Sequence, residues 1–141
     1  MTGHRERQVV AGQDVLPVEL TPDAIGLLRF GAVTRNAHRI HYDAEFARSE
    51  GLAGAVVMAQ LHGCLFHRAA AEFAGAGGQV REVGWRNRAP GHAGDRLVVT
   101  GTVESVDAIS GAVTLDLVER CGAGGAGDVV CCRGRAVVVL R

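Results

Sequence analysis

The chain has 141 residues, of which 48% are apolar, and its 15 basic and 15 acidic side chains give a formal net charge of +0. This length suits one domain with one core, so we expect a single domain over 1–141 with 1–10 as a frayed N-terminus. The balanced charge excludes the electrostatic footprint of a nucleic-acid or membrane-surface binder, and 4% aromatic residues offer no stacking platform for bases.

The sequence predicts a soluble, cytoplasmic protein. Its charged start, 1–7, has no apolar run behind it, which argues against a signal peptide. No run of about 18 apolar residues is present to span a membrane. The absence of a Cys-x-x-Cys pair argues against a zinc knuckle. In a reducing cytoplasm we expect four small, buried cysteines: Cys64, Cys121, Cys131 and Cys132.

The first third of the chain predicts an extended segment followed by two helices. Residues 14–20 are extended, with Pro17 as an interruption. Thr21 is the expected N-cap of a helix that ends before Asn36. From this helix three apolar side chains are expected to face inward: Ile25, Leu28 and Val33. After a polar loop over 36–42, Asp43 caps a short helix that runs to about Glu50.

Residues 55–73 predict one long central helix. Apolar and alanine residues occupy nearly every face of this segment, which indicates a helix buried on most sides. Gly63 lies in its middle, where glycine is costly unless a neighbouring backbone or ligand comes close. The glycines at 75, 77 and 78 end it.

The residue pattern in the second half of the chain predicts β-strands. The expected strands cover 79–88, 96–106, 112–119 and 128–140, with turn residues between them. In the third strand Val113, Leu115 and Leu117 alternate with a polar set in which we place Glu119. The glycine-rich run 122–127 is interpreted as a hairpin tip, because a phosphate loop needs a helix after it.

This order of elements favours one α+β architecture. A buried helix followed by about four antiparallel strands is satisfied when a curved antiparallel sheet wraps around one long central helix. That arrangement is the hot-dog domain.

The run Asn36-Ala37-His38-Arg39-Ile40-His41-Tyr42-Asp43 carries the most specific signal. It resembles the hydratase motif of the MaoC-like dehydratase and hydratase family, in the branch that reads N-x-H-x-I-H-Y-D. The likeness continues through 53–57 at the helix entry and through the turn 89–95, so it covers nearly the whole chain. It implies the same hot-dog fold and an acyl-thioester hydro-lyase of fatty acid or polyketide metabolism.

The chemistry of that reaction explains why such residues are needed. Dehydration of a 3-hydroxyacyl thioester removes an α-proton and expels the β-hydroxyl, and hydration reverses these steps. Histidine titrates near neutrality and can take a proton and return it. The enolate oxygen needs fixed N–H donors, which the start of a buried helix supplies.

The resemblance assigns roles to particular residues. It implies that His41 is the general acid and base, that Asn36 is its partner, and that the backbone around Met58 and Ala59 is the oxyanion site. Many relatives have aspartate at the partner position, and an amide cannot accept a proton as a base. His41 then serves as both acid and base, or Asp43 shares the work. Relatives also open the helix with His-Gly, where this chain has Met58-Ala59.

Further residues are candidates for substrate binding, each with an alternative structural role. Gln60, Gly63 and Cys64 lie on the central helix, and Cys64 is equally explained by core packing. Arg88, with Arg86, has the charge to meet the phosphates of a carrier. His62 and His67 could line a substrate tunnel together with Gln60, but a dimer contact or a satisfied core histidine is the favoured interpretation. His38 is interpreted as a donor that stabilises the loop.

The expected ligand is an acyl thioester of coenzyme A or of an acyl carrier protein, with no metal and no cofactor. The resemblance implies a homodimer or a hot-dog heterodimer, whose sheets join edge to edge and so protect their edges. Three alternatives stay open: a catalytically silent subunit of a heteromeric dehydratase, a hot-dog thioesterase, and a module that binds acyl or polyketide ligands without turnover. Neither nucleic acid nor a membrane is an expected partner.

Overall fold

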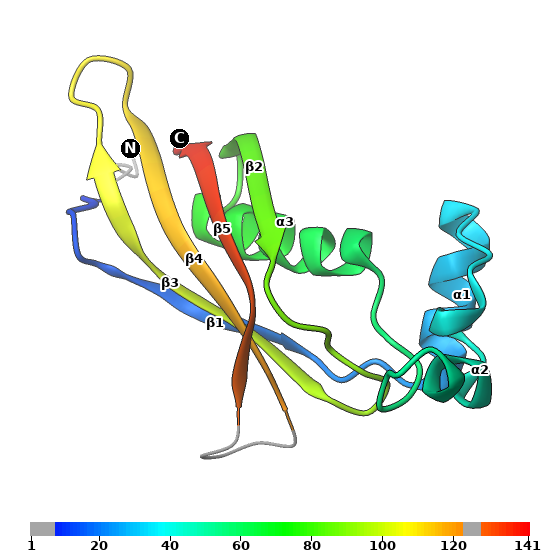
Figure 1. The fold of residues 1–141 in the computed structure, drawn as a ribbon. Helices are drawn as coiled ribbons and strands as arrows, with labels where there is room; N and C mark the ends of the chain where they lie inside the picture. The colour runs from blue at the N-terminus through cyan, green and yellow to red at the C-terminus, as the bar shows by residue number, and fades with distance from the viewer. Residues whose placement is uncertain (1–7, 123–127) are drawn as a thin grey trace.

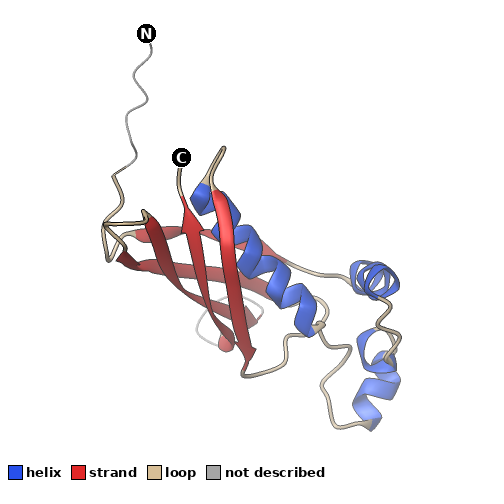
Figure 2. Cartoon of the chain, turned by 90° about the horizontal axis from the view of Figure 1, so that it is seen from above, coloured by secondary structure: helices blue, strands red, loops and turns tan. Residues whose placement is uncertain are grey.

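The computed structural model describes residues 8–122 and 128–141 of the chain (Figure 1). A five-stranded antiparallel sheet carries one long helix on its face, and two shorter helices lie beyond its end (Figure 2). In chain order the elements are β1 (Asp14–Leu20), α1 (Ala24–Thr34), the 3-10 helix η1 (Arg39–His41), α2 (Ala44–Ser49), α3 (Ala59–Ala74), β2 (Gln79–Asn87), β3 (Arg96–Val106), β4 (Ala112–Gly122) and β5 (Val129–Val139). The predicted α+β hot-dog fold is therefore confirmed.

The strand order is β1-β3-β4-β5-β2, which places β1 and β2 at the two edges. An antiparallel meander of the four late strands is the expectation, and it holds for β3, β4 and β5, each of which pairs with the next along the chain. β2 departs from it, because it pairs with β5 and not with β3. The segment 14–20 is a full strand that pairs with β3, and it accommodates Pro17 at an irregularity between Val15 and Val18. The chain thus contributes five strands where about four were expected.

Helix α3 packs on the sheet through one face, and it contacts all five strands. Phe66 is fully buried between this helix and the sheet, and burial of one such side chain stabilises the fold by about 1.5–3 kcal/mol. Gly134 of β5 makes room for the Phe66 ring, since a Cβ there would collide with it. The opposite face of α3 is exposed, so the expectation of burial on most sides is wrong for this chain. Its exposed residues include Gln60, Cys64, His67, Arg68, Ala71 and Glu72.

Helix α3 begins four residues later than predicted. The N–H of Val56 donates to the carbonyl of Ile40 at 2.9 Å, and that of Val57 donates to the carbonyl of Gly91 at 2.8 Å. Two consecutive β-branched residues favour this extended backbone. Residues 55–58 therefore connect the motif loop to the turn at 91–93 before the helix starts.

Helix α1 differs from its prediction at its start and in its buried face. The cap is Asp23, whose Oδ1 accepts the Gly26 N–H at 2.6 Å, and not Thr21. Leu27 and Gly31 are the buried positions. The three side chains expected to face inward are exposed, because α1 lies beyond the end of the sheet and only one narrow stripe of it is covered (Figure 1). They are Ile25, Leu28 and Val33.

The cysteines only partly match the expectation of four small buried side chains. Cys121 on β4 and Cys131 on β5 are buried side by side, with their Cα atoms 5.9 Å apart. Cys132 is buried as a free thiol, as expected, whereas Cys64 is exposed on the outer face of α3. Core packing is therefore the wrong explanation for Cys64.

Within 8–122 and 128–141, no helix is long and apolar enough to cross a membrane. The predicted hairpin tip at 122–127 falls almost entirely outside the described residues, as does most of the predicted frayed N-terminus.

Candidate active site

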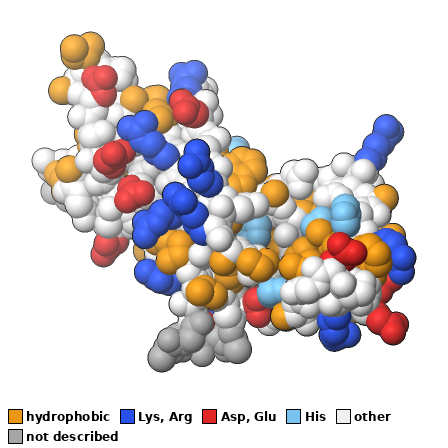
Figure 3. Space-filling view, viewed as in Figure 1, with side chains coloured by type: hydrophobic (Ala, Val, Ile, Leu, Met, Phe, Trp, Pro, Cys, Tyr) orange, Lys and Arg blue, Asp and Glu red, His pale blue; other side chains and the backbone are white. Residues whose placement is uncertain are grey.

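A cavity of about 560 Å³ opens between the motif loop, the start of α3 and the end of β2. Several histidine side chains lie in the narrower region between the sheet and the helices α1 and α2 (Figure 3). The lining combines two histidines with three amides, one arginine and several apolar side chains. The lining residues are Asn36, Ile40, His41, Leu52, Val56, Val57, Ala59, Gln60, His62, Asn87, Arg88, Ala89 and Pro90.

His41 is held in this wall by the backbone. It ends the 3-10 helix η1 and is 8% exposed. Its Nδ1 lies 2.8 Å from the carbonyl oxygen of Val56. Since a carbonyl oxygen only accepts hydrogen bonds, Nδ1 carries the proton, and Nε2 of the neutral ring has a free lone pair. The ring is thus fixed in the tautomer that a general base requires.

Asn36 reaches the same cavity from the end of α1. Its Oδ1 accepts the N–H of His38 at 3.3 Å, which is a local turn contact. The side-chain NH₂ group, with two donors, is left to hold a water or a hydroxyl group. His38 stabilises the loop as predicted, although as an acceptor: its Nδ1 receives the N–H of Ile40 at 3.3 Å.

The start of α3 supplies N–H donors to the cavity. Met58 is the N-cap residue, and its side chain makes no capping hydrogen bond. The first N–H groups of a helix have no partner within the helix, and the helix dipole makes them favourable sites for developing negative charge. Ala59 and Gln60 both line the cavity at this position. The side chain of Met58 turns away and lines a second hollow, of about 380 Å³, against α1.

Besides Met58, three of the predicted site residues lie outside the cavity. Asp43 caps α2, accepting the Phe46 N–H at 2.9 Å, and pairs with Arg39 at 2.7 Å. The Phe46 N–H is the main cause that lowers the pKa of Asp43, followed by Arg39. Gly63 lies against the Trp85 ring, which a Cβ would strike. Cys64 points outward.

Arg88 lies where the cavity meets a shallow basic groove on the outer face of the sheet. The groove has a volume of about 290 Å³ and lies over β2 and β5. Arginine side chains gather over the strands in Figure 3. Four arginines line the groove: Arg86, Arg88, Arg133 and Arg135. Arg135 is paired with Glu104 at 3.0 Å, so part of this charge is already compensated.

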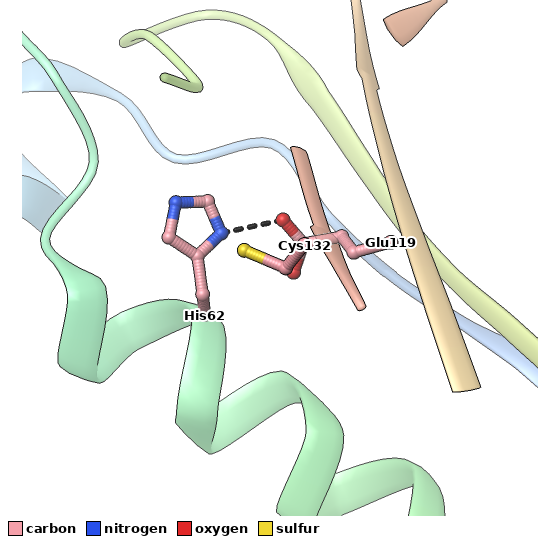
Figure 4. Close-up of side chains that lie close together, drawn as sticks. All are labelled: His62, Glu119 and Cys132. Atoms are coloured by element: carbon pink, nitrogen blue, oxygen red, sulfur yellow. Dashed lines mark hydrogen bonds and ion pairs between the residues drawn. The ribbon is translucent and has the colours of Figure 1, made fainter. Parts of the chain in front are cut away.

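A buried polar cluster of His62, Glu119 and Cys132 lies behind the cavity, which only His62 of the three lines (Figure 4). His62 is the satisfied core histidine that was expected, because its Nδ1 lies 2.5 Å from Oε1 of Glu119. Cys132 donates to Oδ1 of Asn87 at 3.2 Å. The ligand atoms of His62, Glu119 and Cys132 lie within 4.8 Å of one another, close enough to share an ion. His62 Nδ1, Glu119 Oε1 and the Cys132 thiol are engaged in these hydrogen bonds, and we assign no metal here.

Sequence reasoning missed Glu119. It was placed with the outward polar residues of β4, but it follows Val113, Leu115 and Leu117 at the same two-residue spacing and is fully buried. Side chains two apart on a strand share a face. A carboxylate at an inward position was therefore the available signal, and a buried carboxylate requires a partner.

Comparison with solved structures supports the fold. The (R)-hydratase from A. caviae involved in PHA biosynthesis has a TM-score of 0.84 at 21% identity, over 96% of this chain and 99% of that chain. A structure titled MaoC-like dehydratase has a TM-score of 0.83 at 18% identity, over 94% of this chain and 41% of that longer chain. The C-terminally truncated HadBC (3R-hydroxyacyl-ACP dehydratase) complex from Mycobacterium tuberculosis has a TM-score of 0.70 at 15% identity, over 92% and 97%.

Comparison at the level of sequence identifies the family. No curated protein sequence matches the chain. A family model described as hydroxyacyl-thioester dehydratase type 2 matches residues 3–93, which is more than half of the chain. The matched range contains the motif loop and all of α3, the two segments that build most of the cavity. The chain belongs to the hydroxyacyl-thioester dehydratase type 2 family, in agreement with the resemblance to MaoC-like hydratases.

Proposed function

We propose that this protein is a cytoplasmic dehydratase or hydratase that acts on 3-hydroxyacyl or enoyl thioesters, with His41 as a general acid and base. The observation that carries the proposal is the shared cavity, in which the fixed His41 ring, the Asn36 amide and the start of α3 meet. In the dehydration direction, Nε2 of His41 takes the α-proton. The N–H groups at the start of α3 stabilise the enolate oxygen, and Asn36 holds the departing hydroxyl.

The basic groove supports a carrier with phosphates. Pantetheine thioesters of coenzyme A and of acyl carrier protein both bring phosphate groups to the mouth of an active site, and arginine binds phosphate in a fork geometry. Arg88 belongs to both the cavity and the groove, so it connects the reacting end of such a substrate to its carrier.

A second candidate function, a silent subunit of a heteromeric dehydratase, is favoured by two substitutions. Asn36 cannot accept a proton, and Ala59 places a methyl group where relatives of the MaoC-like type have glycine. The HadBC structure is named as a dehydratase complex. Co-purification of a second hot-dog chain, together with an inactive isolated protein, supports the subunit role over a self-sufficient enzyme.

The test is a panel of 3-hydroxyacyl and enoyl thioesters of coenzyme A and of carrier protein, offered to the purified protein. Loss or gain of the conjugated enoyl absorbance supports the hydro-lyase. Release of free thiol instead identifies a thioesterase, and binding without either change identifies an acyl-binding module.

A further inference from the structure

Behind the cavity, against its lining residue His62, lies a buried carboxylate that the proposed function does not use. Glu119 is 0% exposed and lies on the inward face of β4. Its Oε2 is buried and has no hydrogen-bond partner among the described residues. A buried carboxylate is costly unless a neighbour compensates its charge. The fold therefore has to give Glu119 a proton-bearing partner.

His62 of α3 is that partner. It is 2% exposed, lines the cavity, and places Nδ1 2.5 Å from Oε1 of Glu119. In Figure 4 the ring extends from α3 toward the carboxylate, and its second nitrogen points away from Glu119. Because Nδ1 is engaged, Nε2 is the nitrogen left for a ligand in the cavity. A ring that carries both protons neutralises the buried carboxylate and keeps a proton on Nε2 to donate.

The two histidines of the cavity have different hydrogen-bond partners. His41 donates from Nδ1 to a neutral carbonyl, which leaves a lone pair on Nε2. His62 places Nδ1 against a carboxylate. The cavity therefore offers two imidazole rings for proton transfer, although Asn36 cannot transfer a proton itself.

We propose that His62 is a second catalytic residue of this cavity, the acid that protonates the leaving hydroxyl, and that Glu119 is its positioning residue. This proposal rests on the proposed function. As Nε2 of His41 removes the α-proton, the electrons of the Cα–H bond pass to the thioester carbonyl and form the enolate, which then re-forms the carbonyl and makes the Cα=Cβ bond. The Cβ–O bond breaks, and the oxygen keeps its electron pair, takes the Nε2 proton of His62 and leaves as water. Proton exchange with solvent then resets both rings, and hydration runs the same steps in reverse.

The other titratable groups near His62 fit this assignment. Cys132 of β5 lies beside the pair, and burial, followed by the charge of Glu119, raises the pKa of its thiol to about 12. It therefore stays protonated and neutral. Arg88 lines the same cavity on the side of β2. His92, in the turn beside residue 91, pairs with Asp95, with Nδ1 and Oδ2 3.6 Å apart.

The experiment separates removal of the α-proton from loss of water. A 3-hydroxyacyl thioester is incubated in D₂O with wild type, His62→Gln or His41→Ala, and both deuterium uptake at Cα and enoyl formation are followed. Glutamine keeps a polar group of similar length but cannot transfer a proton. We expect His62→Gln to lower enoyl formation by about 10²–10⁴-fold, the usual contribution of one acid–base group, while deuterium exchange continues. His41→Ala should lose both.

A control variant and a pH–rate profile complete this experiment. His67→Gln alters an exposed histidine on the other face of α3 and should behave as wild type. The wild-type kcat/KM should fall on both sides of a pH optimum, and His62→Gln should lose the alkaline limb. Glu119→Gln should lose the same limb, because the amide cannot hold the charged ring. If His62→Gln does not fold, the wild-type profile decides, and a single limb overturns the proposal.

The opposing outcomes are distinct. A wild type that turns over thioesters, with a His62→Gln variant that dehydrates equally fast, overturns the role of His62 and leaves the proposed function intact. A wild type without turnover on any thioester defeats the proposed function instead. Activity that is lost on chelation and restored by Zn²⁺ also overturns the proposal, because His62, Glu119 and Cys132 would then bind a metal.

Discussion

Two polar side chains flank His41, the proposed catalytic histidine of the motif, and the fold gives them different surroundings. Asn36 faces the cavity, where its amide donors are available to substrate. Asp43, two residues after His41, is turned toward the first N–H groups of α2 and toward Arg39. At residue scale, the motif therefore divides between groups that line the cavity and a group that fixes the loop behind it.

This division predicts that Asp43→Ala reduces stability without loss of turnover. The pKa of Asp43 is lower in the folded chain than its ordinary 3.8. A carboxyl group of this kind stabilises the fold fully above its unfolded pKa, and the effect is lost as pH falls through the folded value. Thermal unfolding at neutral pH should show a lower Tm for Asp43→Ala, with the difference vanishing in acid. Asp43→Asn, which still caps the helix, should retain most of the stability.

A loss of turnover in Asp43→Asn with an unchanged Tm would contradict this account. It would instead place Asp43 among the proton-transfer groups.

At the scale of elements, the contact between α3 and β2 depends on Gly63. Trp85 is the single tryptophan of the chain, and its ring occupies the space that a side chain at Gly63 would need. We predict that Gly63→Leu displaces the ring and destabilises the protein by about 1–3 kcal/mol through overpacking. The denaturant midpoint should fall, and tryptophan emission should shift to longer wavelength as the ring becomes more exposed.

Gly84→Leu is the matched control. It lies on β2 with open space around its Cβ position, so the same enlargement should leave both the midpoint and the emission near wild type. Unchanged emission in Gly63→Leu would contradict the packing of Trp85 on α3.

We predict that the arginines of β2 and β5 in the basic groove bind the carrier of the substrate. Reversing the charge at Arg86 and Arg133, which pair across the two strands, should raise KM for coenzyme A thioesters and leave kcat nearly unchanged. Added salt should narrow the difference, because exposed charges are screened. Arg48→Glu, on α2 and outside the groove, serves as the control. An unchanged KM in the double variant would place the carrier elsewhere.

The positions of the strands and of the motif loop could be predicted from sequence more fully than which faces of the helices are buried. Alternating residues and turn glycines mark β3 and β5 closely, and Asp43 marks the start of α2. The exposed face of α3 could not be predicted, because alanine fits a buried and an exposed position equally well. Glu119 lay in a recognisable inward register, but its partner His62 is 57 residues away along the chain. Only the pairing of sheet and helix brings these two together.

At the scale of the whole molecule, the sheet has two free edges in the single chain, β1 and β2. Unpaired edges favour association with another chain, and α3 also leaves one face exposed. We predict that the protein in solution has at least twice the 14.7 kDa mass of one chain. Sedimentation equilibrium measures this directly, and a monomer at micromolar concentration would contradict the proposed edge-to-edge pairing.

The central claim is that His41, fixed in the cavity by the Val56 carbonyl, performs proton transfer on an acyl thioester. The most direct measurement is the steady-state rate of enoyl-thioester hydration by wild type and by His41→Ala, with circular dichroism to verify the fold of both. The account predicts a folded His41→Ala variant whose kcat/KM is lower by about 10²–10⁴-fold, as expected for the loss of a general acid–base group. A folded His41→Ala variant that hydrates the thioester at the wild-type rate would contradict it.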